Sequence, residues 1–330
     1  MTTSSASSPS RAESRGVANA IRRYQRFTIV SHSRPDGDAI GSGFAMALAL
    51  RALGKDVRVV SSDLPAPPLL AQPGVSDIVV TARVDDPGDA VIVMECGDLA
   101  RTGVAGLDGA FVINIDHHTG NTVYGDLNWI DESAAACGEM VFTVIEALGV
   151  PLSLDIATHV YVAILTDTGS FHYANITPRT FAICQQCMEA GVNPPAIARS
   201  IFDSNSLGGL KLFGAVLNGM ALDATGRIAL ISVDHRTAAS CGGTYDDTEG
   251  INNLPLTVTA IVAVAFFKEV ATDQWRVSLR SKALVNVNAV AREFGGGGHK
   301  NASGCTAHGT LPELKAIFAA KLTEAIERAG

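Results

Sequence analysis

The chain has 330 residues and a formal net charge of −8, with 25 Lys and Arg against 33 Asp and Glu. Proteins that bind duplex nucleic acid need a basic face for the phosphates, and no such face is evident in this acidic sequence. Apolar residues make up 47% of the chain, enough for a large core, and the longest largely apolar run, 256–267, is too short to span a membrane. We therefore expect neither duplex nucleic acid nor a membrane as a partner.

The cysteines and the N-terminal residues indicate a cytoplasmic location. The six cysteines are scattered and form no regular framework, which is typical of reduced thiols. Cys184 and Cys187 lack a second Cys or His pair at zinc-finger spacing, so we interpret them as two thiols on one amphipathic helix. Residues 1–15 are rich in Ser, Ala and Arg without an apolar stretch, which predicts a disordered tail and not an export signal.

The first half of the chain alternates short apolar runs with helical patterns. Residues 27–31, 57–61, 78–80, 90–96 and 111–115 read as strands, and 40–53 reads as a helix between the first two. Further helical patterns cover 138–148, 154–165 and 179–190, and another lies near Ile197. Such alternation predicts an α/β domain over 16–202, with a doubly wound, mainly parallel sheet and helices on both faces.

The second half predicts a smaller α/β domain with a mixed sheet over 223–330. Residues 203–222 mix Ser, Asn, Gly and apolar side chains, so we predict a linker there. Strands are expected at 228–233, 256–267 and 275–281. Thr310 and Glu313 have capping-box spacing, and apolar residues at helical spacing follow them, which predicts a final helix.

Acidic and histidine side chains recur after the predicted strands of the first half. His32, Asp36 and Asp38 follow the first strand, Asp98 follows residues 90–96, the triplet 116–118 follows residues 111–115, and Asp167 follows a helix. Ligands of open α/β sheets bind at the carboxyl ends of the strands. One such Asp alone would read as a helix cap, but several carboxylates at one edge repel each other unless a cation neutralises them. Mixed Asp and His ligands suit Mn²⁺, with Mg²⁺ or Co²⁺ as substitutes.

These motifs resemble the DHH phosphoesterase family, which is named for the triplet that here is Asp116-His117-His118. His32-x-x-x-Asp36-x-Asp38 looks like the family's first motif, Asp98 like its second and Asp167 like its fourth. The segments 278–282 and 295–304 look like the DHH-associated C-terminal domain. The overall layout is similar to the branch of short-RNA nucleases, pAp phosphatases and cyclic-di-AMP phosphodiesterases. His172 departs from it, because relatives often carry Arg there.

The resemblance implies two metal ions in an inter-domain cleft. It also implies a homodimer, which is typical of the relatives. One ion would be held by His32, Asp36 and Asp98, and the other by Asp38, Asp98, His117 and Asp167, with Asp98 bridging both. Asp116 would orient a histidine, and His118 would stabilise the phosphoryl oxygens and protonate the leaving oxygen. We refer to Asp116 and His118 as the catalytic pair.

The glycine run 295–298 can approach a ligand closely and form an anion-binding nest, although a flexible hairpin tip is the alternative. The resemblance implies that one phosphate of the substrate is bound by residues of the second domain, namely Arg280, Ser281, Gly296, Gly297, Gly298 and His299.

We therefore expect a two-metal, manganese-dependent phosphodiesterase or phosphatase. Its substrates would be cyclic-di-AMP, pApA, short single-stranded oligoribonucleotides or pAp, and its products mononucleotides. Three alternatives remain open: a manganese inorganic pyrophosphatase, a long-substrate single-strand exonuclease of the same family, and a non-catalytic nucleotide sensor. Turnover of pyrophosphate would identify the first, and binding without turnover the last.

Overall fold

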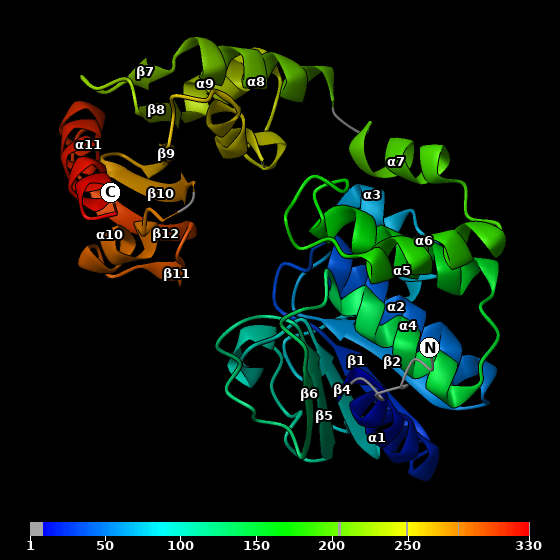
Figure 1. Ribbon diagram of the computed structural model, residues 1–330. Coiled ribbons are helices and arrows are strands. Elements are labelled where there is room, and N and C mark those ends of the chain that lie inside the picture. The colour runs from blue at the N-terminus through cyan, green and yellow to red at the C-terminus, as the bar shows by residue number, and fades with distance from the viewer. Residues whose placement is uncertain (1–8, 204–205, 249, 283, 330) are drawn as a thin grey trace, which may run out of the picture. The chain divides into compact units, whose positions relative to one another are not determined.

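The computed structural model describes residues 9–203, 206–248, 250–282 and 284–329. The chain divides into two compact units, Met1–Ser204 and Asn205–Gly330 (Figure 1). This boundary lies inside the predicted linker.

The first unit is built on a six-stranded parallel sheet with the order β3-β2-β1-β4-β5-β6. Its strands are short, and β1, β4 and β5 are almost wholly buried, as their apolar sequences predict. They run over Arg26–Val30 (β1), Asp56–Ser61 (β2), Val79–Val80 (β3), Ala90–Met94 (β4), Phe111–Asp116 (β5) and Leu127–Ile130 (β6). The order reverses between β1 and β4, which creates a switch point at the centre of the sheet.

The two faces of this sheet are covered differently. The helices α1 (Pro9–Arg23), α2 (Gly37–Ala52), α4 (Cys137–Leu148) and α5 (Leu154–Asp167) belong to the large core on one face. The opposite face, which presents Val30, Val60 and Val91, is covered by the short 3₁₀ helix η2 (Leu99–Thr102) and by connecting segments. Within the described residues, the prediction of helices on both faces is met on this face only by η2, and the rest of the connection from β4 to β5 is irregular.

The remaining helices of the first unit are α3 (Pro67–Leu70), η1 (Val75–Asp77), α6 (Pro178–Glu189) and α7 (Pro194–Phe202). Cys184 and Cys187 are buried as free thiols on α6, as predicted. The prediction of a disordered tail is wrong for residues 9–15, which form the start of α1. Val17 and Ile21 of this helix are fully buried, so the apolar face of α1 is held by the core.

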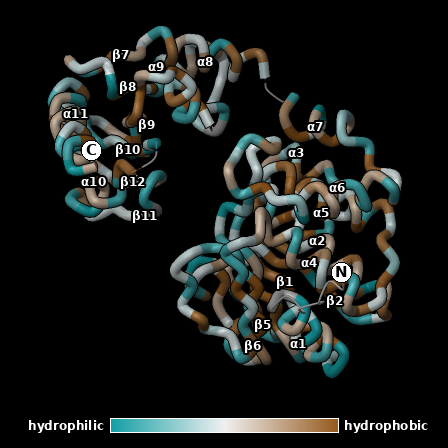
Figure 2. The backbone as a smooth tube through the Cα atoms, viewed as in Figure 1, coloured by the Kyte–Doolittle hydropathy of each residue, from teal (hydrophilic) through white to brown (hydrophobic). Residues whose placement is uncertain are grey.

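The second unit has a mixed six-stranded sheet with the order β11-β12-β10-β9-β8-β7, in which the pair β8–β9 is parallel. Helices α10 and α11 pack with one core cluster of this unit, and α8 belongs to another. Figure 2 shows brown, apolar segments near β5 in the first unit and near β9 in the second, whereas β11 is pale to teal. The elements are α8 (Leu207–Asn218), β7 (Ala221–Leu222), β8 (Ile228–Val233), α9 (His235–Cys241), η3 (Asp246–Thr248), η4 (Ile251–Asn253), η5 (Pro255–Thr257), β9 (Ala263–Ala271), β10 (Gln274–Ser281), α10 (Val287–Glu293), β11 (Gly297–His299), β12 (Ala302–His308) and α11 (Leu311–Glu327).

Two predictions for the second half are wrong in their bounds. Most of the predicted linker is helix α8, which Ser206 caps and whose Leu212 and Val216 are buried. The strand predicted from residue 256 begins at Ala263, because Pro255 starts the 3₁₀ helix η5 before it. The capping box of Thr310 and Glu313 at α11 is confirmed. In the described part of the chain, no helix combines the length and apolarity that crossing a bilayer requires.

Candidate metal centre

The predicted acidic and histidine residues gather at the switch point of the parallel sheet. Asp36 and Asp38 follow β1, and the triplet 116–118 begins at the last residue of β5. Glu95, which was not among the predicted residues, follows β4. Because β1, β4 and β5 are parallel neighbours, their carboxyl ends lie at one edge of the sheet. Asp167, the last residue of α5, joins them there.

His117 lies at the centre of the site. Its Nδ1 is 3.0 Å from the carbonyl oxygen of Ala134, so Nδ1–H donates to this carbonyl. Its Nε2 faces three carboxylates, at 3.3 Å from Glu95 Oε1, 3.5 Å from Asp167 Oδ2 and 3.8 Å from Asp38 Oδ2. A backbone carbonyl that fixes the second ring nitrogen is the usual arrangement behind a metal-binding histidine.

Asp38 is held rigidly in the site. It is 1% exposed and accepts hydrogen bonds from the Ser42 hydroxyl at 2.7 Å, from Cys137 N at 2.7 Å and from Gly138 N at 3.1 Å. The two backbone donors form the N-terminus of α4, where the helix dipole favours an anion. Asp38 is not the cap of its own helix, because Asp36 caps α2.

Glu95 is a site residue that the sequence reading missed. It is 1% exposed, its Oε2 lies 3.7 Å from His118 Nδ1, and it forms a potential metal-binding group with His117 and His118. Its backbone has φ of +59°, a left-handed conformation that costs a side-chain-bearing residue about 1–3 kcal/mol. The available signal was an acidic residue at the end of an apolar run, but the predicted strand 90–96 contained it. Strand β4 ends at Met94.

Asp98, the predicted bridging ligand, is not brought into either of the potential metal-binding groups found among the described residues. Its side chain is the N-cap of η2 and accepts a hydrogen bond from Ala100 N at 2.8 Å. Asp98 is exposed, whereas Glu95 is buried beside His117. The cap reading, which was the alternative for each isolated Asp, holds for this residue.

The other predicted residues form two pairs beside this centre. His32 donates from Nδ1 to Ser33 O at 2.8 Å, and its Nε2 lies 3.7 Å from Asp36 Oδ2. Asp116, which is fully buried, lies 2.9 Å from Nδ1 of His118. These contacts agree with the predicted role of Asp116 in orienting a histidine.

The donor set fits a divalent cation. Glu95 Oε1 and His117 Nε2 are buried and make no hydrogen bond within the described residues. Burial, followed by repulsion from Asp38, raises the pKa of Glu95 well above its usual range and the pKa of Asp167 to about 7. Burial alone would lower the pKa of His117, but interaction with Glu95, Asp38 and Asp167 raises it to about 11. Such an excess of negative charge is what a bound cation would neutralise.

We expect metal binding to release protons. At neutral pH the metal-free site holds a proton on His117 and, in part of the molecules, one on Asp167, and these protons must leave before the groups can bind an ion. Affinity for Mn²⁺ should therefore rise with pH from below 7 upwards. Calorimetric titration in buffers of different ionisation enthalpy should show a buffer-dependent heat, and D167N should release fewer protons than the native protein near pH 7. A heat independent of the buffer would contradict this.

The second unit places the predicted phosphate-binding side chains on β10. The Ser281 hydroxyl donates to Val285 O at 2.7 Å and accepts from Asn301 Nδ2 at 2.9 Å, so it holds the segment that follows β10. Ser281 is also 8% exposed, and these contacts make it a structural residue. Arg280 is half-buried and donates to Leu279 O at 3.2 Å.

The glycine run starts as the end of a helix. Gly295, with φ of +71°, follows α10, and Gly296 N donates to Ala291 O at 2.9 Å. A Cβ on Gly296 would collide with Gly304 O of β12, so only glycine fits at this position. The N–H of Gly296 is thus used within the fold.

The rest of the run is an edge strand. Gly297 and Gly298 belong to β11, which pairs only with β12 in the sheet order. This arrangement is neither the predicted nest nor a flexible tip, although an edge strand does direct part of its backbone N–H groups outward. His299 belongs to β11 by its backbone, and its side chain lies outside the described part of the chain.

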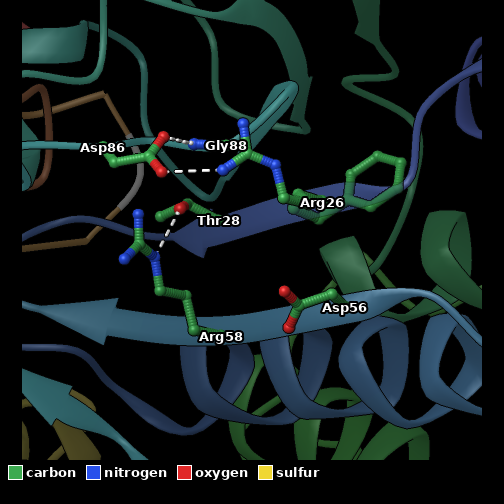
Figure 3. A pocket seen from close by; sticks show the side chains of 7 residues that line it. Arg26, Thr28, Asp56, Arg58, Asp86 and Gly88 are labelled. Carbon is green, nitrogen blue, oxygen red and sulfur yellow. Dashed lines mark hydrogen bonds and ion pairs between the residues drawn. The ribbon is translucent and has the colours of Figure 1, made fainter.

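A polar pocket of about 210 Å³ lies at the other edge of the parallel sheet, at the amino ends of β1 and β2 (Figure 3). Arg26 pairs with Asp86 at 2.7 Å, and Arg58 Nε donates to the Thr28 hydroxyl at 2.9 Å. Asp86 also accepts from Gly88 N at 3.0 Å. These contacts tie the segment before β4 to the sheet, and we assign them a structural role.

Residues 26–164 match the model of the DHH family, N-terminal domain, and residues 235–328 match the DHHA1 domain. The bifunctional oligoribonuclease and PAP phosphatase NrnA of Thermus thermophilus is 32% identical to the chain over 306 residues, which cover 92% of this chain and 90% of that protein. The chain belongs to the DHH family. This confirms the resemblance predicted from the motifs.

Two further proteins are similar to the chain over most of its length. The bifunctional oligoribonuclease and PAP phosphatase NrnA of Bacillus subtilis is 28% identical over 297 residues, covering 88% of this chain and 92% of that protein. The crystal structure of an exopolyphosphatase-related protein from Bacteroides fragilis superposes with a TM-score of 0.88 at 27% identity, and the match covers 95% of this chain and 96% of that one. The match of the DHH fold thus extends over nearly the whole chain.

Proposed function

We propose that the protein hydrolyses short oligoribonucleotides and pAp with two divalent metal ions, Mn²⁺ first among them. The observation that carries the proposal is the convergence of Asp38, Glu95, His117 and Asp167 at the switch point of a DHH-family sheet. The NrnA relatives, which match along nearly their full length, support the substrate class. The protein is thus a metal-dependent phosphoesterase of short nucleotides.

We assign the metal ligands to two overlapping groups of residues. Glu95 would take the bridging role that the family resemblance implied for Asp98, with His117 beside it. His32 and Asp36 would complete the ligand group of one ion, and Asp38 and Asp167 would complete that of the other. When bound, the ions would polarise the phosphoryl oxygens and lower the pKa of an attacking water.

The protein itself supplies orientation and proton handling. Asp38 keeps one geometry because three donors hold it. His118, oriented by Asp116, would stabilise charge on the phosphoryl oxygens and give a proton to the leaving oxygen. Arg280 and the backbone of Gly297 and Gly298 would bind a second substrate phosphate. The predicted inter-domain cleft, the homodimer and the cytoplasmic location stay predictions.

A substrate panel tests the function. Purified protein with Mn²⁺ should hydrolyse pAp and di- and trinucleotide RNA to mononucleotides, with pApA and cyclic-di-AMP as further candidates. D38N serves as the control for contaminating nucleases and should be inactive on all of them. Faster turnover of pyrophosphate than of every nucleotide would favour the pyrophosphatase, preference for long single strands would favour the exonuclease, and binding without turnover would favour the sensor.

A further inference from the structure

A chain of three asparagine amides, of which Asn114 is buried and Asn121 and Asn128 are half-buried, leads from the backbone to Asp116 and His118. Asn128 accepts from Gly125 N at 2.9 Å and donates to Gly125 O at 2.6 Å. These two backbone groups fix which end of the Asn128 amide is oxygen and which is nitrogen. Its Oδ1 in turn accepts from Asn114 Nδ2 at 3.1 Å. Asn114 is fully buried in β5 and lies opposite Asn128 in the register of β5 and β6.

Asn114 in turn fixes the orientation of the Asn121 amide. Asn114 Nδ2 also donates to Asn121 Oδ1 at 2.9 Å, and Val123 N donates to the same oxygen at 2.8 Å. Asn121 must therefore present its Nδ2 group elsewhere, and this group donates to Asp116 Oδ2 at 2.7 Å. Each amide in the chain has its orientation set by the previous one.

Asp116 is the last link before the histidine. Its Oδ2 is taken by Asn121, and its Oδ1 faces the backbone N of His118 at 3.2 Å and the ring Nδ1 at 2.9 Å. A carboxylate only accepts hydrogen bonds, so the proton of this ring contact resides on Nδ1 of His118. The opposite ring nitrogen, Nε2, is thereby directed away from Asp116.

We propose that Asn121 is a positioning residue which, through Asp116, holds His118 with its proton on Nδ1 and presents Nε2 to the substrate phosphate. This inference rests on the proposed function of the same site. The amide chain explains why three asparagines lie in and around the last two strands of the sheet, where apolar side chains would otherwise be expected. Loss of such an outer partner reduces turnover in metal sites by about 10–100-fold.

The test replaces the donor without removing the residue. In N121D the side chain keeps its size and its acceptor oxygen but loses the N–H that Asp116 accepts, and N121A removes both as a neutral second variant. We expect kcat on dinucleotide RNA to fall about 10–100-fold while KM and metal content change little. Nitrogen NMR of histidine-labelled, magnesium-loaded protein should show Nδ1–H on His118 in the native protein and loss of that state in both variants.

Thr122 provides the matched control in the same loop. Its hydroxyl donates to Gly97 O at 3.2 Å, so T122V removes a hydrogen bond of this loop while the contacts of Asp116 stay. The tautomer and kcat should not change in T122V. Unchanged tautomer and kcat in N121D and N121A would overturn the inference. If the native protein hydrolyses no nucleotide while N121D still alters the tautomer, the proposed function fails and the positioning role stands.

Discussion

Replacing Glu95 by glutamine is expected to lower kcat/KM by about 100-fold or more and to weaken metal binding. Glutamine keeps the size of the side chain but removes the charge that lies 3.3 Å from His117 Nε2. Loss of an outer partner already costs about 10–100-fold, and a direct ligand should cost at least as much. Turnover with Mn²⁺ and metal content by elemental analysis are the measurements.

The stability of the metal-free variant separates a ligand from a structural residue. Burial and the neighbouring Asp38 disfavour the charge of Glu95, whereas His117 favours it, so these effects oppose each other and E95Q should unfold at about the same temperature as the native protein without metal. The rise in Tm that Mn²⁺ causes in the native protein should shrink in E95Q.

Asp98 offers the matched control, because it lies three residues along the same segment. Asparagine caps helices about as well as aspartate, so D98N should retain the hydrogen bond to Ala100 N, the activity and the metal content. If D98N lost metal and E95Q kept it, the sequence-based ligand set would be correct and ours wrong.

Replacing Gly41 by alanine is expected to destabilise the first unit and to lower activity together. A Cβ at this position would lie 2.6 Å from His159 O and 2.8 Å from Ala163 N, which are backbone atoms of α5 and cannot rotate away. Overpacking of this kind costs about 1–3 kcal/mol, or about 2–12 °C in Tm for a unit of this size. Because α2 carries Asp38 and α5 carries Asp167, pushing the two helices apart should also move these side chains apart and weaken the metal site.

Gly43 lies on the same helix and serves as the control. A Cβ there would meet Ile29 and Val59 at 3.8 and 3.9 Å, which is ordinary contact. Alanine is also favoured over glycine inside a helix by about 1 kcal/mol. G43A should therefore be as stable as the native protein or more so. Equal melting temperatures for G41A and G43A would contradict the close packing of α2 on α5.

The sequence alone predicted the parallel sheet and most of the candidate site for one physical reason. Apolar runs followed at once by Asp or His identify strands and their carboxyl ends, and parallel neighbours bring these ends together. Asp38 and His117 were placed after strands in this way and Asp167 after a helix, and the structure brings the three within one group. The resemblance to the DHH family was drawn in part from the same residues.

Other features of the site depend on backbone conformation and on contacts between elements, which the pattern of apolar residues does not reveal. Glu95 was hidden because the strand ends at Met94, two residues before its predicted end, and because a left-handed backbone at Glu95 then directs its side chain. Asp98 looked like a ligand because a cap and a ligand have the same sequence context. The glycine run was read as a nest, whereas a helix end and close contact with β12 determine its conformation.

The most direct measurement of the central claim is anomalous diffraction from crystals of the protein soaked in manganese. We predict two peaks at the switch point of the parallel sheet, both in contact with the Glu95 carboxylate, one also bound to His32 and Asp36 and the other to Asp38, His117 and Asp167. Peaks held by Asp98 with Glu95 turned away, or an ordered site without any peak, would contradict the account.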